Sequence, residues 1–208
     1  MQASSPDTDE LLARAAQGDD RAVGALMARH RQRLRRMIAV RLDARVVHRV
    51  DPSDVVQESL VEASQKLPHY LEAPPLPFYP WLRQIACNRI ARLHEQHIRA
   101  SKRTVNREEP LDCGLNEDSV AALARQLIGP ASSPSRAVMR AEQRNQLRVA
   151  LERLASPDRD VLVMWYLEGL AVDEVAAILG ITEAAAKVRH FRAIRRLSIL
   201  LKQTSEEG

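Results

Sequence analysis

The clearest chemical signal in the sequence is a row of cations near its C-terminus. Residues 182–201 hold five basic side chains against a single acid, Glu183. Cations at helical spacing can neutralise the phosphates of a nucleic acid. The five are Lys187, Arg189, Arg192, Arg195 and Arg196. The pattern therefore indicates a helix that binds a polyanion, and a basic face that contacts only solvent is the alternative.

The residues just before this segment make the signal more specific. Residues 172–179 form a short amphipathic pattern, Gly180 supplies the positive φ that ends a helix, and Thr182 is a suitable N-cap for the next helix. A short helix, a glycine turn and a basic helix make up the helix-turn-helix pattern. We therefore predict that the helix over 182–201 contacts DNA.

The two faces of this helix differ when residues are projected at 100° intervals. The face predicted to pack on the preceding helix holds Ala186, His190, Ala193 and Leu197. The opposite face holds Ala184, Val188, Phe191 and Arg195, with Lys187 and Arg192 at its edges. Apolar groups between cations suit a major groove, because the groove presents thymine methyl groups and is bordered by phosphates.

A second group of candidate functional residues consists of carboxylates near the middle of the first half of the chain. Asp51 and Pro52 are a helix-start pair, and Asp54 and Glu58 lie on one face of the helix that follows. A metal-dependent nuclease would need more ligands, and no further carboxylate or histidine cluster joins these in sequence. The face also holds Gln57, Val61 and Gln65. Its acidity would repel DNA, so a protein partner is favoured over DNA, and an ordinary solvated face is the alternative.

Segment 68–80, PHYLEAPPLPFYP, combines prolines with ring side chains. The prolines predict a stiff, non-helical loop. His69 and Tyr70 are candidates for stacking on an unpaired base, and a loop whose rings are anchored in the core is the alternative. The helix that follows has a buried side of Leu82, Ile85, Ala86, Ile90 and Leu93. Its contacts with phosphates or bases are expected from Asn88, Arg92, Arg99, Lys102 and Arg103.

Arg89 projects close to the apolar side of the same helix and is a candidate for an internal ion pair. Residues 21–103 carry 16 basic and 7 acidic side chains, a net charge of +9, whereas residues 1–20 have a net charge of −4. A basic block of this size indicates a polyanionic partner.

The composition favours an all-α fold. Of 208 residues 45% are apolar but only 3% are aromatic, so the cores must be aliphatic, and no convincing strand pattern occurs. Two small helical domains are expected at 9–103 and 136–203, joined by a flexible linker, 104–135, in which the short segment SVAALARQLI could form one helix. Helices are expected near 9–18, 20–42, 52–66, 80–101, 136–154, 157–168, 172–179 and 182–201.

Several protein classes are disfavoured. The sequence has no signal peptide, no run long enough to cross a bilayer, and no zinc, Walker, nucleophile-elbow or dinucleotide motif. Cys87 and Cys113 lack metal spacing and are expected to be free thiols in a reducing cytosol. We therefore expect a cytoplasmic protein without membrane insertion, cofactor or metal, and not an enzyme.

Taken in order, these segments resemble a bacterial RNA polymerase sigma factor of the extracytoplasmic-function (ECF) type. DPSDVVQESLVEA resembles the region 2 segment that docks on the clamp helices of the polymerase. FYPWLRQIACNRI resembles the helix that recognises the minus-ten promoter element. The long segment from LERLASPDRD to FRAIRRL resembles region 4, which reads the minus-thirty-five element. The resemblance covers nearly all of residues 9–201.

The resemblance implies roles for individual residues. Polymerase binding falls to Asp54, Gln57, Glu58 and Val61. The minus-ten reader comprises Asn88, Arg92, Arg99, Lys102 and Arg103, with His69 and Tyr70 in the loop where the family captures a flipped base. The minus-thirty-five reader comprises Thr182, Glu183, Ala184, Lys187, Val188, Arg189, Phe191, Arg192 and Arg195. Residues 104–135 resemble the segment threaded toward the polymerase active-site cleft.

The chain departs from the family pattern at two of these positions. Arg92 stands where an acid is common, and Ala186 stands where a larger β-branched residue is frequent. The function implied is that of a subunit that binds core RNA polymerase through its clamp helices and flap and directs promoter recognition and DNA opening. The chain is expected to be a monomer when free, with an anti-sigma factor as a further candidate partner. A helix-turn-helix regulator that binds an operator without polymerase is the alternative.

Overall fold

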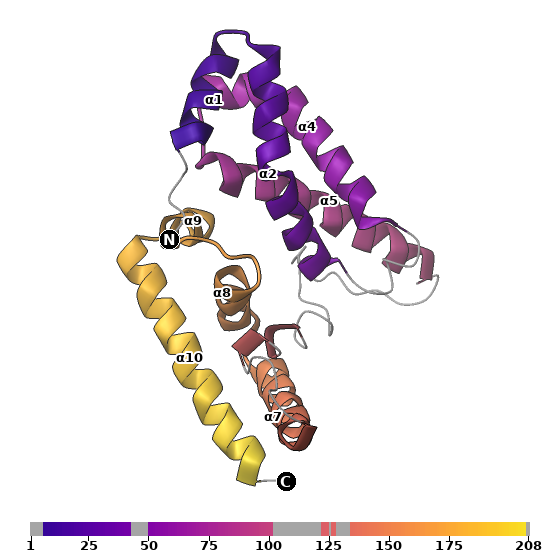
Figure 1. Ribbon diagram of the computed structural model, residues 1–208, viewed down its shortest axis with the longest axis vertical. Helices are drawn as coiled ribbons and strands as arrows, with labels where there is room; N and C mark the ends of the chain where they lie inside the picture. Colours follow the sequence, from indigo (N-terminus) through magenta and orange to yellow (C-terminus); the bar gives the residue numbers. More distant parts are fainter. Residues whose placement is uncertain (1–5, 43–49, 102–121, 125, 128–133, 207–208) are drawn as a thin grey trace. The chain divides into compact units, whose positions relative to one another are not determined.

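The computed structural model describes residues 6–42, 50–101, 122–124, 126–127 and 134–206 (Figure 1). In this part of the chain every regular element is a helix, which confirms the predicted all-α class. The chain divides into two compact units between Gly114 and Leu115. No helix within the described residues is both long and apolar enough to span a membrane.

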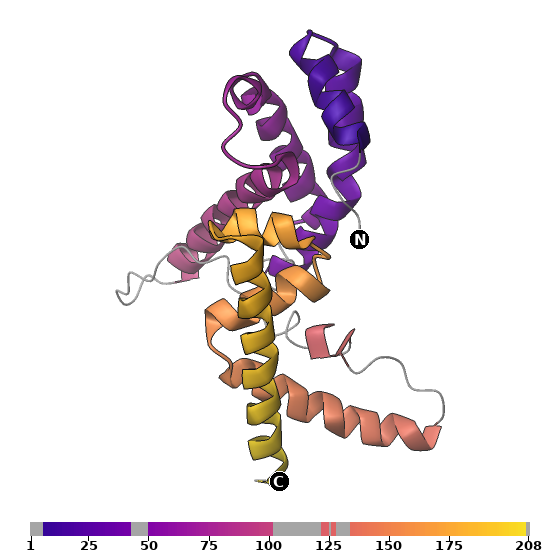
Figure 2. The ribbon, with the colours of Figure 1, turned by 90° about the vertical axis from the view of Figure 1, so that its left-hand side faces the viewer.

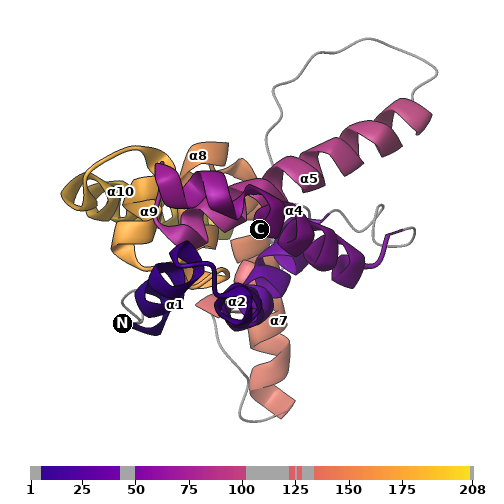
Figure 3. The ribbon, with the colours of Figure 1, turned by 90° about the horizontal axis from the view of Figure 1, so that it is seen from above.

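Among the described residues, the first unit has four helices: α1 (Pro6–Ala16), α2 (Asp20–Arg41), α4 (Pro52–Glu72) and α5 (Phe78–Ser101). Helices α2, α4 and α5 pack against one another in pairs, and α1 packs along α2 (Figure 3). Their shared core is largely aliphatic, as the composition predicts. Its fully buried members include Leu26, Leu34, Met37, Ile38, Val55, Leu67, Leu82 and Ile90.

Aspartates start two of these helices. The Asp19 carboxylate accepts hydrogen bonds from the amides of Arg21 and Ala22 at 2.9 and 3.2 Å, which satisfies two donors at the start of α2. The Asp51 carboxylate accepts from the amide of Ser53 at 2.7 Å, with Pro52 in the first turn of α4. The predicted N-cap at Asp51 is therefore confirmed, and its carboxylate has a structural role.

The prediction of a non-helical segment from residue 68 is wrong at its start. Helix α4 continues through Pro68 to Glu72. An internal proline costs a helix about 3 kcal/mol. Here Leu67 and Tyr70, on either side of Pro68, are both buried. Burial of these two side chains offsets the lost backbone bond, so the loop is confined to the residues between α4 and α5.

Apart from the exposed His69, the ring side chains of this segment form an aromatic cluster in the core rather than an exposed platform. The Tyr70 ring lies 4.5 Å from Trp81 and 5.7 Å from Phe78, measured between ring centroids. The His30 ring of α2 lies 5.1 Å from Phe78 and 5.8 Å from Tyr79. Four of the seven Phe, Trp and Tyr residues of the chain thus lie where α2, α4 and α5 meet.

The second unit contains α7 (Pro134–Arg153), α8 (Ser156–Tyr166), α9 (Val172–Leu179) and α10 (Glu183–Glu206). Helix α10 contacts all three others and runs from α9 at its start, past α8, to α7 (Figures 1 and 2). The core between them holds Leu151, Val161, Leu162, Val175, Ala186 and Ala193. All of the helices predicted for the two domains are present, with ends that differ by a few residues apart from the extension of α4.

Part of the predicted linker packs within the second unit. Residues 122–124 and 126–127 are helical, and Leu123 and Ala124 are buried. The Gln126 side-chain amide donates a hydrogen bond to the carbonyl of Tyr166 at the end of α8. Residues 104–121, 125 and 128–133 of the predicted linker lie outside the described residues.

Candidate functional sites

A glycine turn joins α9 to α10. Gly180 has φ 64° and ψ 33°, the left-handed conformation that a glycine adopts without a Cβ clash. The amide of Ile181 donates to the carbonyl of Ala176 at 3.0 Å, which closes α9. The Thr182 hydroxyl accepts from the amide of Ala185 at 3.2 Å and caps α10. The predicted helix-turn-helix, with its glycine turn and threonine cap, is therefore confirmed.

The predicted inner face of α10 is buried. Ala186, Ala193 and Leu197 lie in the core of the second unit. The His190 ring stacks on Trp165 of α8, with 4.4 Å between centroids, and burial lowers the pKa of this imidazole. Small side chains at 186 and 193 permit close helix packing, so the orientation of α10 follows from its sequence.

The opposite face of α10 is open to solvent. Phe191 is 66% exposed and Val188 is 48% exposed. Most of the remaining predicted contact residues on this helix are also exposed: Thr182, Glu183, Ala184, Lys187, Arg192 and Arg195. Arg189 is half-buried. The structure thus brings two apolar side chains and a set of cations to one accessible helix face, in the arrangement predicted for a major groove.

Arg196 differs from the other cations of this helix. Its guanidinium donates to the carboxylate of Asp158, which is buried at the start of α8. A buried carboxylate needs a partner to offset its desolvation. Arg196 therefore has a structural role in the second unit. Its position in the sequence does not reveal this role.

The outer surface of α4 carries a row of side chains between two hollows. Gln57, Val61 and Gln65 form a row along it, and Val61 is 48% exposed. A hollow of about 370 Å³ toward α2 and one of about 340 Å³ toward α5 are both lined by these three residues. We call this row, with its two flanking hollows, the α4 ridge. A partner helix or loop would meet an apolar side chain between two depressions.

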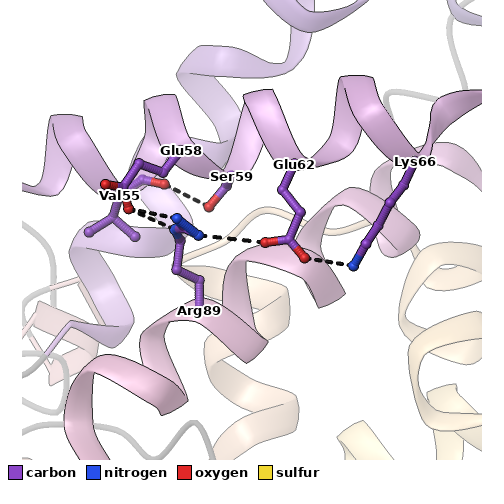
Figure 4. Close-up of polar contacts among 6 residues, drawn as sticks. All are labelled: Val55, Glu58, Ser59, Glu62, Lys66 and Arg89. Carbon is purple, nitrogen blue, oxygen red and sulfur yellow. Dashed lines mark hydrogen bonds and ion pairs between the residues drawn. The ribbon is translucent and has the colours of Figure 1, made fainter. Parts of the chain in front are cut away.

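An arginine from a neighbouring helix lines each hollow. On the α2 side, Arg31 donates a hydrogen bond of 2.9 Å to the side-chain oxygen of Gln57. On the α5 side, Arg89 donates to Oε2 of Glu58 through Nε at 2.9 Å and pairs with the same oxygen through Nη2 at 2.8 Å (Figure 4). Arg89 was a candidate for an internal ion pair, and this prediction is confirmed.

The ion pairs continue along α4. Nη1 of Arg89 lies 3.5 Å from Oε2 of Glu62, and Nζ of Lys66 lies 2.6 Å from Oε1 of the same carboxylate (Figure 4). The hydrogen bond from Lys66, with the nearby cations, lowers the pKa of Glu62. Within the helix, the Ser59 hydroxyl donates to the carbonyl of Val55 at 2.6 Å (Figure 4).

The acidic face predicted on α4 is consequently less acidic than its sequence indicates. Glu58 and Glu62 both have cationic partners, whereas Asp54 is exposed without an ion pair among the described residues. Lys66 could have been anticipated from its position four residues after Glu62. Arg31 could not, because its contact joins residues 26 positions apart.

The promoter-facing residues predicted on α5 divide into three groups. Asn88 and Arg92 are exposed, and His69, at the end of α4, is exposed beside Glu72. Lys102 and Arg103 lie outside the described residues, and so does the side chain of Arg99. The prediction for Tyr70 requires correction, because its side chain is only 5% exposed and its hydroxyl donates to the carbonyl of Leu76 at 3.0 Å. Burial raises the pKa of Tyr70 to about 12.

Two of the carboxylates that a metal-dependent nuclease could use have other partners in the structure. Asp51 caps α4 and Glu58 pairs with Arg89. Across the described residues, no three His, Cys, Asp or Glu side chains are grouped so that they could hold a metal ion.

Comparison with known proteins points to one class. The family described as Sigma-70, region 4 matches residues 144–197, which include α9, the glycine turn and α10 as far as Leu197. The chain is 29% identical over 204 residues to the RNA polymerase sigma factor CnrH of Cupriavidus metallidurans, covering 97% of this chain and 98% of that protein. It is 29% identical over 188 residues to the ECF RNA polymerase sigma-E factor of Salmonella typhimurium, covering 89% and 90% of the two proteins.

A solved structure resembles the whole chain as well. The structure of CnrH in complex with the cytosolic domain of CnrY matches with a TM-score of 0.54 and 25% identity, over 95% of this chain and 98% of that one. The chain thus combines a helix-turn-helix that has an exposed basic face with a second helical unit that has a ridged surface. The region 4 match and the similarity over nearly the whole chain support an ECF-type RNA polymerase sigma factor.

Proposed function

We propose that the chain serves as a detachable specificity subunit of RNA polymerase, with the two units of the chain dividing the work. The first unit would dock on core polymerase and read the minus-ten element, and the second would read the minus-thirty-five element. The observation that carries this proposal is the presence, in one chain, of the exposed α10 face and the α4 ridge. The similarity to sigma factors over nearly the whole chain supports it.

The minus-thirty-five reader is assigned to the outward face of α10. Val188 and Phe191 would contact thymine methyl groups, and Lys187, Arg192 and Arg195 would contact phosphates or base edges. Their exposure supports this role. Arg189 is half-buried and would act at the margin of the contact.

The minus-ten reader is assigned to the exposed side of α5. Asn88 would contact a base edge, and Arg92, which stands where the family commonly has an acid, would favour a phosphate or a guanine edge. Arg99, Lys102 and Arg103 stay as further candidates in this reader. Arg92→Asp should change the minus-ten preference selected from a promoter library, and an unchanged preference would remove Arg92 from the reader.

Polymerase docking is assigned to the α4 ridge and the acids beside it. Asp54, Gln57, Glu58 and Val61 all have exposed side chains on this helix. The clamp helices of core polymerase are the proposed partner here, and the flap is the proposed partner of the second unit. An anti-sigma factor is a further proposed partner, because the similar CnrH was solved with the cytosolic domain of CnrY.

The minus-ten and minus-thirty-five binding surfaces would each bind weakly. They would act together only when core polymerase fixes the distance between them. Tethering raises the effective concentration of the second contact. We therefore expect weak promoter binding by the free chain and strong binding once core polymerase is present. An operator-binding regulator would show the opposite behaviour, with tight binding in the absence of polymerase.

Run-off transcription tests the proposal. The purified chain is combined with purified core polymerase on a library of genomic fragments, and the RNA 5′ ends are mapped. Discrete start sites that depend on the chain are expected. A matched reaction with Val188→Asp and Phe191→Asp, both exposed, should lose these starts while core binding persists. Absence of chain-dependent starts with an active core would refute the proposal.

A further inference from the structure

The ion pairs between α4 and α5 connect two surfaces to which different roles are assigned. Glu58 and Glu62 belong to α4, beside the α4 ridge, whereas Arg89 belongs to α5 and follows Asn88 directly in sequence. The hollow of about 340 Å³ is lined by all three side chains. Figure 4 shows the Arg89 guanidinium between the two carboxylates.

The geometry of the contact restricts Glu58 more than an ordinary surface pair would. Both Nε and Nη2 of Arg89 meet the same oxygen, Oε2, at 2.9 and 2.8 Å. Because both contacts go to Oε2, the second oxygen, Oε1, can still accept hydrogen bonds. The side chain of Glu58 is 56% exposed. A carboxylate held this way can accept a hydrogen bond from a partner without first losing rotamer freedom.

Arg89 itself is poorly placed to contact a large partner. Its side chain is about half as exposed as that of Glu58, and it packs between α4 and α5. A guanidinium fork held in position by two carboxylates is rigid, whereas a lysine at this position would supply a single flexible point charge. The arrangement therefore suits support of a neighbouring contact residue.

We propose that Arg89 is a positioning residue for polymerase binding, which holds the Glu58 carboxylate in the orientation that core polymerase recognises. The proposal rests on the assignment of the α4 ridge as the docking surface. It adds that the helix assigned to minus-ten recognition also determines the affinity for polymerase, so that substitutions in this helix can alter both activities.

The expected effect follows from the rotamer freedom that Arg89 removes. Immobilising one flexible side chain at an interface weakens binding by about two- to tenfold. Arg89→Met removes both ion pairs and keeps an unbranched apolar stem, so the dissociation constant for core polymerase should rise about fivefold. Arg89→Lys, which restores one charge without the fork, should recover part of this loss.

Lys66→Met provides the matched control. It removes one positive charge from the same network, but Lys66 pairs with Glu62 and does not contact Glu58. The dissociation constant should change by less than about twofold if orientation of Glu58, rather than total charge, is what matters. Thermal unfolding of each variant shows whether the fold is retained.

The experiment measures equilibrium binding of the full-length chain to core polymerase by fluorescence anisotropy, without DNA. A fourth variant exchanges the charges, with Glu58→Arg and Arg89→Glu together. It should restore thermal stability but not polymerase affinity. An Arg89→Met variant that binds as tightly as the wild type, or more tightly, would overturn the inference and leave the docking assignment standing. Affinity restored by the exchange would also overturn the inference, and it would remove Glu58 from the docking contacts. A wild-type chain that does not bind core polymerase would overturn both.

Discussion

The salt dependence of promoter binding gives a quantitative test of the α10 surface. The perturbation is the triple substitution of Lys187, Arg192 and Arg195 by alanine. All three side chains are exposed on the outward side of α10. Their removal leaves the buried contacts of Ala186 and the rest of the inner face intact, so the fold of the second unit should be retained.

The magnitude follows from counterion release. Each phosphate neutralised on B-DNA contributes about −0.9 to the slope of log affinity against log salt concentration. Three lost contacts should make the slope shallower by about 2.7. Between 50 and 200 mM salt, the decrease in affinity should then be roughly 40-fold smaller than for the wild-type chain.

The assay is binding of polymerase reconstituted with the chain to a promoter identified by run-off transcription, measured across a salt series. Arg196→Ala is the matched control, because this arginine lies on the same helix but pairs with the buried Asp158. The control should leave the slope unchanged and lower the free energy of unfolding by roughly 1 kcal/mol, since it leaves a buried carboxylate without its partner. The reasoning would be refuted by a triple variant with the wild-type slope, or by a control that changes the slope as much as one contact residue.

Three further predictions concern the first unit. Asp54→Lys with Glu58→Lys should abolish co-purification with core polymerase while the melting temperature stays nearly unchanged, because both side chains are exposed; retained co-purification would contradict the docking assignment. Tyr70→Ala should lower the free energy of unfolding by about 3–5 kcal/mol in denaturant titrations, whereas His69→Ala should change it by less than about 0.5 kcal/mol; equal effects would place both residues on the surface. Burial, with the nearby arginine cations, lowers the pKa of His30 from 6.5 to about 4, so the folded state favours the neutral imidazole. Above pH 6.5 neither state binds the proton, and between pH 6.5 and 4 the unfolded chain binds it first, so the free energy of unfolding should fall by roughly 3 kcal/mol over this window. Denaturant titrations across this pH window should show the fall in the wild type but not in a His30→Gln variant. An equal fall in both chains would show that His30 is not its source.

The helix-turn-helix shows which structural features can be predicted from a local sequence pattern. Gly180 and Thr182 act through bonds to residues three or four positions away, and the inner and outer faces of α10 follow from the 3.6-residue period. These interactions are local, so the sequence pattern contains them. The helical period places Ala186 and Phe191 on opposite faces, and one of these faces is buried while the other is exposed.

The α4 and α5 region shows where local patterns are insufficient. The periodicity of α4 marks Glu58 as part of an acidic face, but its partner Arg89 lies 31 residues away and is brought near by packing between helices. The prolines near residue 68 favour a loop by local propensity, yet the buried neighbours Leu67 and Tyr70 continue the helix.

By itself, the amino-acid sequence determined the helical class, the helix-turn-helix and the type of surface that α10 presents. Only the tertiary structure decided which charges remain accessible, which rings enter the core, and which acids pair with Arg89 and Arg196. The physical reason is that helix faces arise from contacts within one turn, whereas charge pairing and burial depend on helices that meet only after the chain has folded.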